Sequence, residues 1–306
     1  MTTRSFAAVL LFAASSLLAQ SARVFVSGSG ADTNACTVTS PCRSFAHAIT
    51  LVNSGGEIIP LDSAGYGPVT IDRSVSISAP EGIYAGVTAS GSGAVGITIS
   101  TASVNVFLRG LTINGAGAST GIQAFSDLVT LQVERLNVSN FAGPCIDFES
   151  AGGLLLVSDS SFRNAYYGVW VNGSATTAAR ATLERIRGLG FNWVNSTGSL
   201  VIAQDYSIVT VSDSVVSGSF RGFEVFDSGQ LRIDHCISTH NVVGVFAGSG
   251  WTGPGNSVMD VSNSLIADNT LKGIEPQNAN VINSRGDNTV LGNAAAETFS
   301  GTFAAK

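Results

Sequence analysis

The sequence predicts an all-β protein, a parallel β-helix of roughly ten stacked turns with a short helix at its N-terminal end. A glycine followed by an apolar residue recurs about every 24 residues, first at Gly96-Ile97 and Gly121-Ile122. A six-residue phrase with polar second and third positions, such as VSDSSF at 157–162, recurs at the same interval. Only 12% of the residues are charged and β-branched residues are abundant, which favours short strands over helices. A repeat of this length buries its apolar side chains only by stacking on its neighbours.

The first 22 residues have the pattern of a secretory signal peptide. Arg4 supplies the positive charge, residues 6–19 are apolar, and Ala19-Gln20-Ser21-Ala22 resembles a cleavage site. A membrane anchor is the alternative, but the apolar stretch falls short of the roughly 18 residues of a spanning helix. We therefore expect a secreted protein, extracellular or periplasmic, with no membrane span once the signal is removed. Residues 23–306 are expected to form a single domain.

Residues 23–80 are expected to form an N-terminal cap and the first turns. The segment 23–27 alternates as a strand, and apolar residues spaced as in a helix predict a short helix over 44–53. Short strands are expected next, at 57–61, 69–71 and 75–77. A helix with one apolar face at this place would cover the open end of the stacked sheets.

The four cysteines divide into two kinds. Cys36 and Cys42 stand in a polar loop, CTVTSPC, whose spacing suits a local disulfide. Cys145 and Cys236 each lie among apolar neighbours, so we expect both to be small buried residues. Neither pair has a second pair or histidines at the spacing of zinc ligands, so no metal site is expected.

The regular turns are expected over 95–293, with a C-terminal tail at 294–306. Two longer intervals between repeats predict insertions, at about 194–207 and 248–257. The former follows Asn192-Trp193, which is a degenerate form of the recurring glycine–apolar pair. Asparagine often marks one turn of the repeat, where stacked amides could form a ladder. These asparagines are Asn140, Asn164, Asn241, Asn269 and Asn293.

The two ends of the domain carry a family resemblance. The N-terminal phrases VFVSGSGADTN, SPCRSFAHAI, GGEI and GYGPVTI, and the closing NTVLGNAAAETFSGTF, resemble secreted bacterial right-handed parallel β-helix proteins of the pectin lyase-like superfamily. The resemblance covers essentially the whole chain after the signal and implies the right-handed form of the fold. It does not imply one activity, because this architecture serves lyases, hydrolases, esterases, epimerases and non-catalytic adhesins.

Polysaccharide cleavage would need acidic and basic groups on one exposed face, either a carboxylate pair or carboxylates holding Ca²⁺ beside a base. The best such group is Asp213, Asp234 and His235, which the repeat places at adjacent corners. A structural ladder is the alternative interpretation, because charges of opposite sign alternate at the third position of the repeated phrase. That position runs Gly110, Arg135, Asp159, Arg185, Asp213, His235 and Asn263.

The hydrolase motifs of the superfamily are absent from the sequence. There is no Asp-Asp pair, and Asp234-His235-Cys236 is not the expected Gly-His-Gly. The only lysines, Lys272 and Lys306, are far along the chain from Asp213, so the base expected of a calcium-dependent lyase is also missing. The ladder is therefore the preferred interpretation of these residues.

Aromatic side chains form a second candidate site. Tyr167, Trp170, Trp193 and Trp251 could stack against sugar rings if they are exposed. The alternative is that aromatic residues of this region fill the core of the β-helix.

Composition and motifs together favour a binding function. The net charge of −6 and the lack of basic runs argue against a nucleic-acid partner. The sequence thus predicts an exported, non-catalytic protein that interacts with extracellular or cell-envelope polysaccharide or forms surface structure. A lyase or hydrolase with a non-standard acidic site is the alternative. No cofactor is expected, except Ca²⁺ if the protein is a lyase, and no oligomeric state is indicated.

Overall fold

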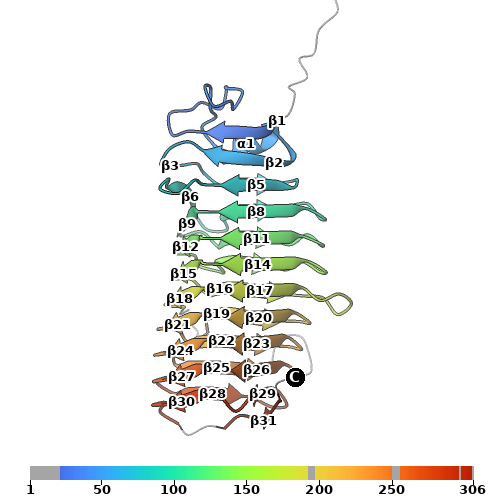
Figure 1. The fold of residues 1–306 in the computed structure, drawn as a ribbon, viewed down its shortest axis with the longest axis vertical. Coiled ribbons are helices and arrows are strands. Elements are labelled where there is room, and N and C mark those ends of the chain that lie inside the picture. The colour runs from blue at the N-terminus through green and yellow to red at the C-terminus, as the bar shows by residue number, and fades with distance from the viewer. Residues whose placement is uncertain (1–20, 192–196, 250–255, 296–297, 305–306) are drawn as a thin grey trace, which may run out of the picture.

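The chain winds into a rod of stacked turns in a computed structural model that describes residues 21–191, 197–249, 256–295 and 298–304 (Figure 1). In these residues three parallel sheets of twelve, ten and nine strands run along the rod. We call them sheet 1, sheet 2 and sheet 3, in the order in which one turn visits them. The rod has about nine turns, close to the roughly ten expected, and the predicted parallel β-helix is confirmed.

Each sheet contains one strand from each successive turn. Sheet 1 consists of β1 (Ser21–Val26), β2 (Val52–Pro60), β5 (Val75–Ser78), β8 (Asn105–Arg109), β11 (Thr130–Glu134), β14 (Leu154–Ser158), β17 (Arg180–Glu184), β20 (Ile208–Ser212), β23 (Gln230–Asp234), β26 (Val258–Ser262), β29 (Val281–Ser284) and β31 (Gly301–Thr302). Sheet 2 consists of β3 (Ala64–Gly65), β6 (Ala85–Ser90), β9 (Leu111–Ala116), β12 (Asn137–Ser139), β15 (Ser161–Arg163), β18 (Arg187–Leu189), β21 (Val215–Ser217), β24 (Ile237–Thr239), β27 (Leu265–Ala267) and β30 (Thr289–Leu291). Sheet 3 consists of β4 (Val69–Ile71), β7 (Val95–Ile99), β10 (Thr120–Ala124), β13 (Ile146–Phe148), β16 (Tyr167–Asn172), β19 (Ser199–Gln204), β22 (Arg221–Phe226), β25 (Val243–Gly248) and β28 (Lys272–Pro276).

The predicted helix lies at the N-terminal end of the rod as α1 (Phe45–Leu51) (Figure 1). The hydroxyl of Ser44 caps it by accepting a hydrogen bond from the amide of His47, at 3.1 Å. The buried face of α1 includes Phe45 and Ile49, and the helix packs beside β1, β2 and β4. It is shorter than the predicted 44–53 because Val52 is already extended and begins β2.

The corner between sheet 1 and sheet 2 is made by a left-handed residue in successive turns. The third position of the repeated phrase has φ between 46° and 70° from Gly110 through Asn263. One residue in this conformation turns the chain sharply without adding a loop. The polar character of this position therefore follows from its place on the outside of a bend.

The recurring glycines lie where consecutive turns of sheet 3 approach each other most closely. A Cβ atom on Gly121 would lie 2.4 Å from the carbonyl oxygen of Cys145, and one on Gly168 would lie 2.5 Å from that of Leu200. No side chain fits at such a distance without moving the backbone. Cys145 occupies the same position in its own turn and departs from the pattern.

We expect Gly121→Ala to lower the free energy of unfolding by about 1–3 kcal/mol, because the new methyl group would push apart two turns of the rod. Chemical denaturation of the variant beside the wild-type protein measures this. Gly65→Ala is the matched control, since a Cβ atom there meets nothing nearer than 4.0 Å. Equal losses in the two variants would contradict the explanation.

The predicted position of one glycine–apolar pair, Asn192-Trp193, is wrong. Val201, not Trp193, pairs with Val169 of the preceding turn, and Leu200 stands at the glycine position. The additional residues of this turn precede β19, because residues 199–204 form a regular strand of sheet 3 and not part of an insertion. Most of the other predicted insertion, 248–257, lies outside the described residues.

The asparagines form two ladders at neighbouring positions of the turn between sheets 2 and 3. Asn140 and Asn164 are left-handed, and their exposed amides are joined by a hydrogen bond of 3.2 Å. The other three stand one position later and point inward. Their amides are linked in series, at 3.2 Å from Asn241 to Asn269 and 2.8 Å from Asn269 to Asn293.

The cysteines differ in their bonding as well as their place. Cys36 and Cys42 are joined by a disulfide with a Cα–Cα distance of 4.6 Å. Cys145 and Cys236 are free thiols in the core. Within the described ranges no helix has the length and apolar character to cross a membrane. The predicted signal peptide, apart from Ser21 and Ala22 in β1, lies outside those ranges.

Candidate functional site

The outer face of sheet 3 carries an unusual row of side chains. The strands alternate between residues that point into the core and residues that point outward. The parallel register places one outward residue of each turn in a single row, which we call the sheet 3 row. Along the rod it runs Gln123, Asp147, Trp170, Ile202, Glu224, Phe246 and Glu275.

Several members of the sheet 3 row are buried although they point away from the core. The exposed fraction is 6% for Asp147, 3% for Ile202, 1% for Glu224 and 0% for Phe246. Two carboxylates thus lie away from water on a face that would ordinarily be solvated. Burying a charge is costly unless it is paired, so each of these carboxyl groups needs either a positively charged partner or a proton.

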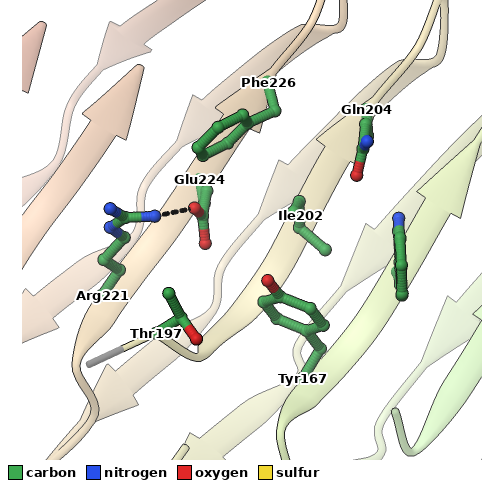
Figure 2. A pocket seen from close by; sticks show the side chains of 8 residues that line it. Tyr167, Thr197, Ile202, Gln204, Arg221, Glu224 and Phe226 are labelled. Atoms are coloured by element: carbon green, nitrogen blue, oxygen red, sulfur yellow. Dashed lines mark hydrogen bonds and ion pairs between the residues drawn. The ribbon is translucent and has the colours of Figure 1, made fainter. Parts of the chain in front are cut away.

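A hollow opens over this face between β16, β19 and β22 (Figure 2). Tyr167, Trp170 and Phe226 form its aromatic walls, and Gln204, Arg221 and Glu224 supply its polar groups. The hollow is partly open to solvent, and its volume of about 40 Å³ is room for about three water-sized groups. The hollow therefore suits one arm of a ligand and not a whole sugar ring.

Glu224 and Arg221 form a buried ion pair at one side of the hollow (Figure 2). Burial raises the pKa of Glu224, while Arg221 and the hydroxyl of Ser199 oppose that rise. The guanidinium of Arg221 lies 3.5 Å from the centroid of the Phe246 ring, a favourable cation–π contact. Arg221 is therefore held by Glu224 and by the aromatic ring together.

Polar atoms around the hollow have unused hydrogen-bonding capacity. Within the described part of the chain, Glu224 Oε2, Arg221 Nε and Trp170 Nε1 are buried and have no hydrogen-bond partner. The second carboxylate oxygen of Glu224 faces the space between Thr197 and Tyr167 (Figure 2). Orphaned buried polar atoms are uncommon in folded proteins, and one acceptor and two donors from residues that line the same hollow could be satisfied by a hydroxyl-bearing ligand.

Asp147 lies beside Trp170 in the sheet 3 row, one turn towards the N-terminus. Burial, with repulsion from Glu149, raises the pKa of Asp147 to about 7. Burial and the charge of Asp205 likewise raise the pKa of Glu149. These carboxylates do not converge on one point: among the described residues, the only group of three or more His, Cys, Asp or Glu side chains within ligand distance of one another is Cys36, Cys42 and His47.

The predicted catalytic residues lie elsewhere, at the corner between sheets 1 and 2. Asp213 and His235 occupy its left-handed position in adjacent turns. Asp234 accepts hydrogen bonds from Ser262 and Asn263, at 2.6 and 2.9 Å, and lies 2.7 Å from the imidazole of His235. Although burial opposes the change, these contacts lower the pKa of Asp234. It is therefore ionised near neutral pH and is not a proton donor there.

The same corner contains the predicted charge ladder in part. Arg185 binds Asp159 through two hydrogen bonds, of 2.6 and 2.9 Å, and this contact lowers the pKa of Asp159. Both side chains are about half exposed, at 48% and 40%. They line an open groove of about 490 Å³ together with Asp213, whereas Asp234 and His235 do not line it. A catalytic role of Asp213, Asp234 and His235 stays a prediction.

The predicted aromatic residues divide into two groups. Tyr167 and Trp170 both line the hollow over sheet 3, with ring centroids 5.4 Å apart. Trp193 and Trp251 lie outside the described residues. Sequence reasoning missed Asp147, Arg221 and Glu224. The available signal was a charged residue inside an otherwise apolar strand, as in RGFEVF at 221–226.

Comparison with known proteins identifies the family. Residues 131–295 match the family described as "Right handed beta helix region". The chain belongs to this family. The right-handed form of the β-helix, which the N- and C-terminal phrases implied, is therefore confirmed. No curated protein matches the chain.

Similar solved structures share the fold at low sequence identity. A pectate lyase, Pel9A, is 15% identical with a TM-score of 0.58, over 92% of this chain and 78% of its own. An alginate lyase from Paenibacillus sp. str. FPU-7 is 14% identical with a TM-score of 0.62, over 89% and 97%. A rhamnogalacturonan lyase is 12% identical with a TM-score of 0.50, over 86% and 72%. These similarities establish the β-helix fold alone.

Proposed function

We propose that this right-handed β-helix is an exported protein that binds extracellular or cell-envelope polysaccharide, without cleaving it, through the hollow over sheet 3. The proposal rests on one observation: buried polar atoms of Trp170, Arg221 and Glu224 lack partners beside aromatic walls. A sugar hydroxyl could donate to Glu224 Oε2 and accept from Arg221 Nε. The sugar ring itself would lie across Trp170, since aromatic faces stack on the apolar faces of sugars. No cofactor takes part.

Binding to a panel of soluble polysaccharides, measured by affinity electrophoresis and titration calorimetry, tests this proposal. We expect Trp170→Ala to weaken binding at least tenfold, because both a stacking surface and a donor disappear. Trp170→Phe, which keeps an aromatic ring but removes the Nε1 donor, should have a smaller effect. Asp234→Ala at the sheet 1–2 corner is the matched control and should bind as the wild type does. Loss of binding in the control but not in Trp170→Ala would contradict the proposal, as would a dependence on Ca²⁺.

A polysaccharide lyase or hydrolase is the second candidate, and Asp147 is the observation in its favour. Its pKa of about 7 suits a residue that both accepts and donates a proton near neutral pH. Hydrolysis needs two carboxyl groups about 5–9.5 Å apart. Glu224 lies three turns from Asp147, roughly 14 Å along the rod, which is too far. Glu149, two residues from Asp147 and about 7 Å along the chain, is the better partner.

Incubation with the same panel, with and without Ca²⁺, distinguishes binding from cleavage. The binding proposal predicts no new reducing ends and no unsaturated uronides. If either product forms, Asp147→Asn and Asp213→Asn then show whether the reacting groups lie on sheet 3 or at the sheet 1–2 corner.

A further inference from the structure

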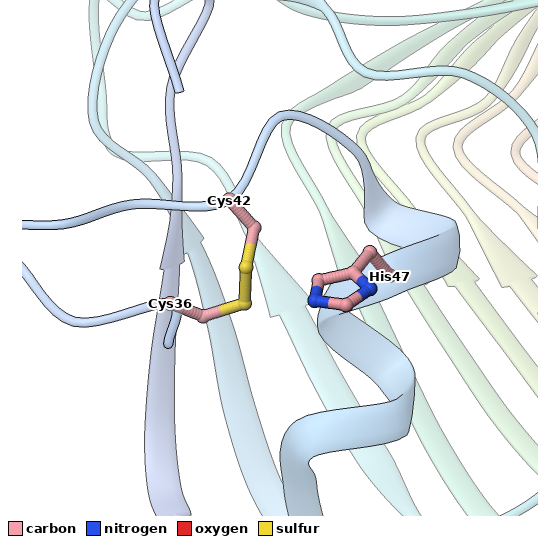
Figure 3. A group of neighbouring side chains, drawn as sticks. All are labelled: Cys36, Cys42 and His47. Carbon is pink, nitrogen blue, oxygen red and sulfur yellow. A yellow bond between two sulfur atoms is a disulfide. The ribbon is translucent and has the colours of Figure 1, made fainter. Parts of the chain in front are cut away.

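The N-terminal cap brings a histidine against the disulfide (Figure 3). Cys36 and Cys42 lie in the loop between β1 and α1, and His47 lies in the first turn of α1. The two sulfur atoms and an imidazole nitrogen all lie within 4.8 Å of one another. The sequence predicted no metal site here, because the sequence alone does not show that α1 places His47 close to Cys36 and Cys42.

Backbone hydrogen bonds hold both cysteines in place independently of the disulfide. The amide of Cys42 donates to Phe25, and its carbonyl accepts from Ser27, at 3.0 and 2.9 Å. The carbonyl of Cys36 accepts from the amide of Phe25, at 2.8 Å. Cleavage of the S–S bond would therefore leave two thiols anchored to β1 and close to each other.

The histidine is also held independently of the disulfide. The carboxylate of Asp32 accepts hydrogen bonds of 2.8 and 2.9 Å from the amides of Arg43 and Ser44, and one of 2.8 Å from the Ser44 hydroxyl. Ser44 in turn caps α1 at His47. Hydrogen bonds thus join the loop to the first turn of the helix in addition to the S–S bond.

Two thiolates and one imidazole are a ligand set of Zn²⁺. With bond lengths of about 2.3 Å to sulfur and 2.0 Å to nitrogen, the ligand atoms of a tetrahedral zinc lie roughly 3.5 Å apart. After reduction the two sulfur atoms, which are bonded to each other in the disulfide, must move apart by side-chain rotation to meet that spacing. Two thiolates neutralise the dication, so the buried cysteines would carry no net uncompensated charge. Water would take the fourth position on the side of His47, which is half-buried.

We propose that the cap is a redox-controlled zinc site formed by Cys36, Cys42 and His47. A dithiol reductant would supply two electrons and two protons as it closes its own disulfide, which converts the Cys36–Cys42 bond into two thiols. Zn²⁺ would then displace both thiol protons to solvent as it binds. The oxidised cap binds no zinc, because its sulfur atoms are bonded to each other.

Zinc content after equilibrium dialysis tests the proposal, on protein in which Cys145 and Cys236 are replaced by Ala so that only the cap has thiols. We expect about one Zn²⁺ per chain after reduction, and less than a tenth of that in the oxidised protein. His47→Ala should weaken binding at least tenfold. His235→Ala, at the sheet 1–2 corner, is the control and should bind normally. Co²⁺ in place of zinc should give thiolate charge-transfer absorption and tetrahedral visible bands that the Cys36→Ser, Cys42→Ser variant lacks.

Three results would overturn the proposal. The first is a reduced protein that retains its β-sheet circular dichroism and takes up no zinc. The second is zinc binding that His47→Ala leaves unchanged, which would mean that the two thiols bind without the third ligand. The third is loss of the β-sheet signal on reduction, because the cap must keep its shape without the disulfide.

Discussion

Replacing Asp147 by Asn is expected to stabilise the protein by up to about 4 kcal/mol at pH 8 and to have little effect at pH 4. Asp147 is buried in the sheet 3 row, and its pKa is raised to about 7 from the usual value near 3.9. The folded state therefore holds a proton that the unfolded state releases between about pH 4 and pH 7. Wild-type stability falls as the pH rises through that range, whereas the neutral asparagine has no such dependence.

Urea unfolding at several pH values measures this difference directly. Asp234→Asn is the matched control, because the pKa of Asp234 is lowered and its stabilising contribution is present above the unfolded value and lost in acid. The control should thus be less stable than the wild type at pH 7 and equally stable at low pH. Its effect on the free energy of unfolding at pH 7 is therefore opposite in sign to that of Asp147→Asn. A stability difference for Asp147→Asn that does not change between pH 4 and pH 8 would show that Asp147 is not buried as described.

Replacing Arg221 by Met is expected to lower the free energy of unfolding by about 3–5 kcal/mol at pH 7, because it leaves Glu224 buried and unpaired. Arg221 opposes the rise in the pKa of Glu224 that burial causes, so its loss raises that pKa further. Stability of the variant should then fall as the pH rises above the unfolded value of about 4.3. Acidification towards that value should shrink the defect.

Two further variants distinguish the destabilisation caused by the unpaired charge of Glu224 from that caused by the lost packing of Arg221. The double variant Arg221→Met, Glu224→Met should recover most of the stability, since no charge is left behind. Arg185→Met is the control for loss of an exposed ion pair, and it should change the stability far less than Arg221→Met does. A double variant as unstable as Arg221→Met alone would assign the loss to the contact with the Phe246 ring.

The repeat could be predicted from the sequence because each of its marks has a local cause. The glycines stand where a Cβ atom would meet the carbonyl of the next turn. The polar third position stands on the outside of a one-residue bend. Such requirements recur in most turns, so their period is visible even where the sequence identity between turns is low. Leu200 escaped notice because no glycine marks its turn.

The candidate site could not be predicted in the same way. Asp147 and Glu224 are the outward residues of their strands, and outward residues of a sheet are ordinarily solvated. Whether such a position is covered depends on side chains from other turns and on the length of the connections between sheets. The cap is similar, since the approach of His47 to the disulfide depends on the direction of α1 and not on sequence spacing.

The direction of the hydrogen bonds between strands determines how the rod resists tension applied to its two ends. In all three sheets the bonds between strands run along the rod, so tension on its two ends would load the turns in series. The turn that contains β13 offers three residues to sheet 3, whereas β10 and β16 on either side offer five and six. Sheet 3 should therefore separate more easily at β13 than at the longer strands on either side. The strand that carries Asp147 is thus also a local weak point of sheet 3 under tension.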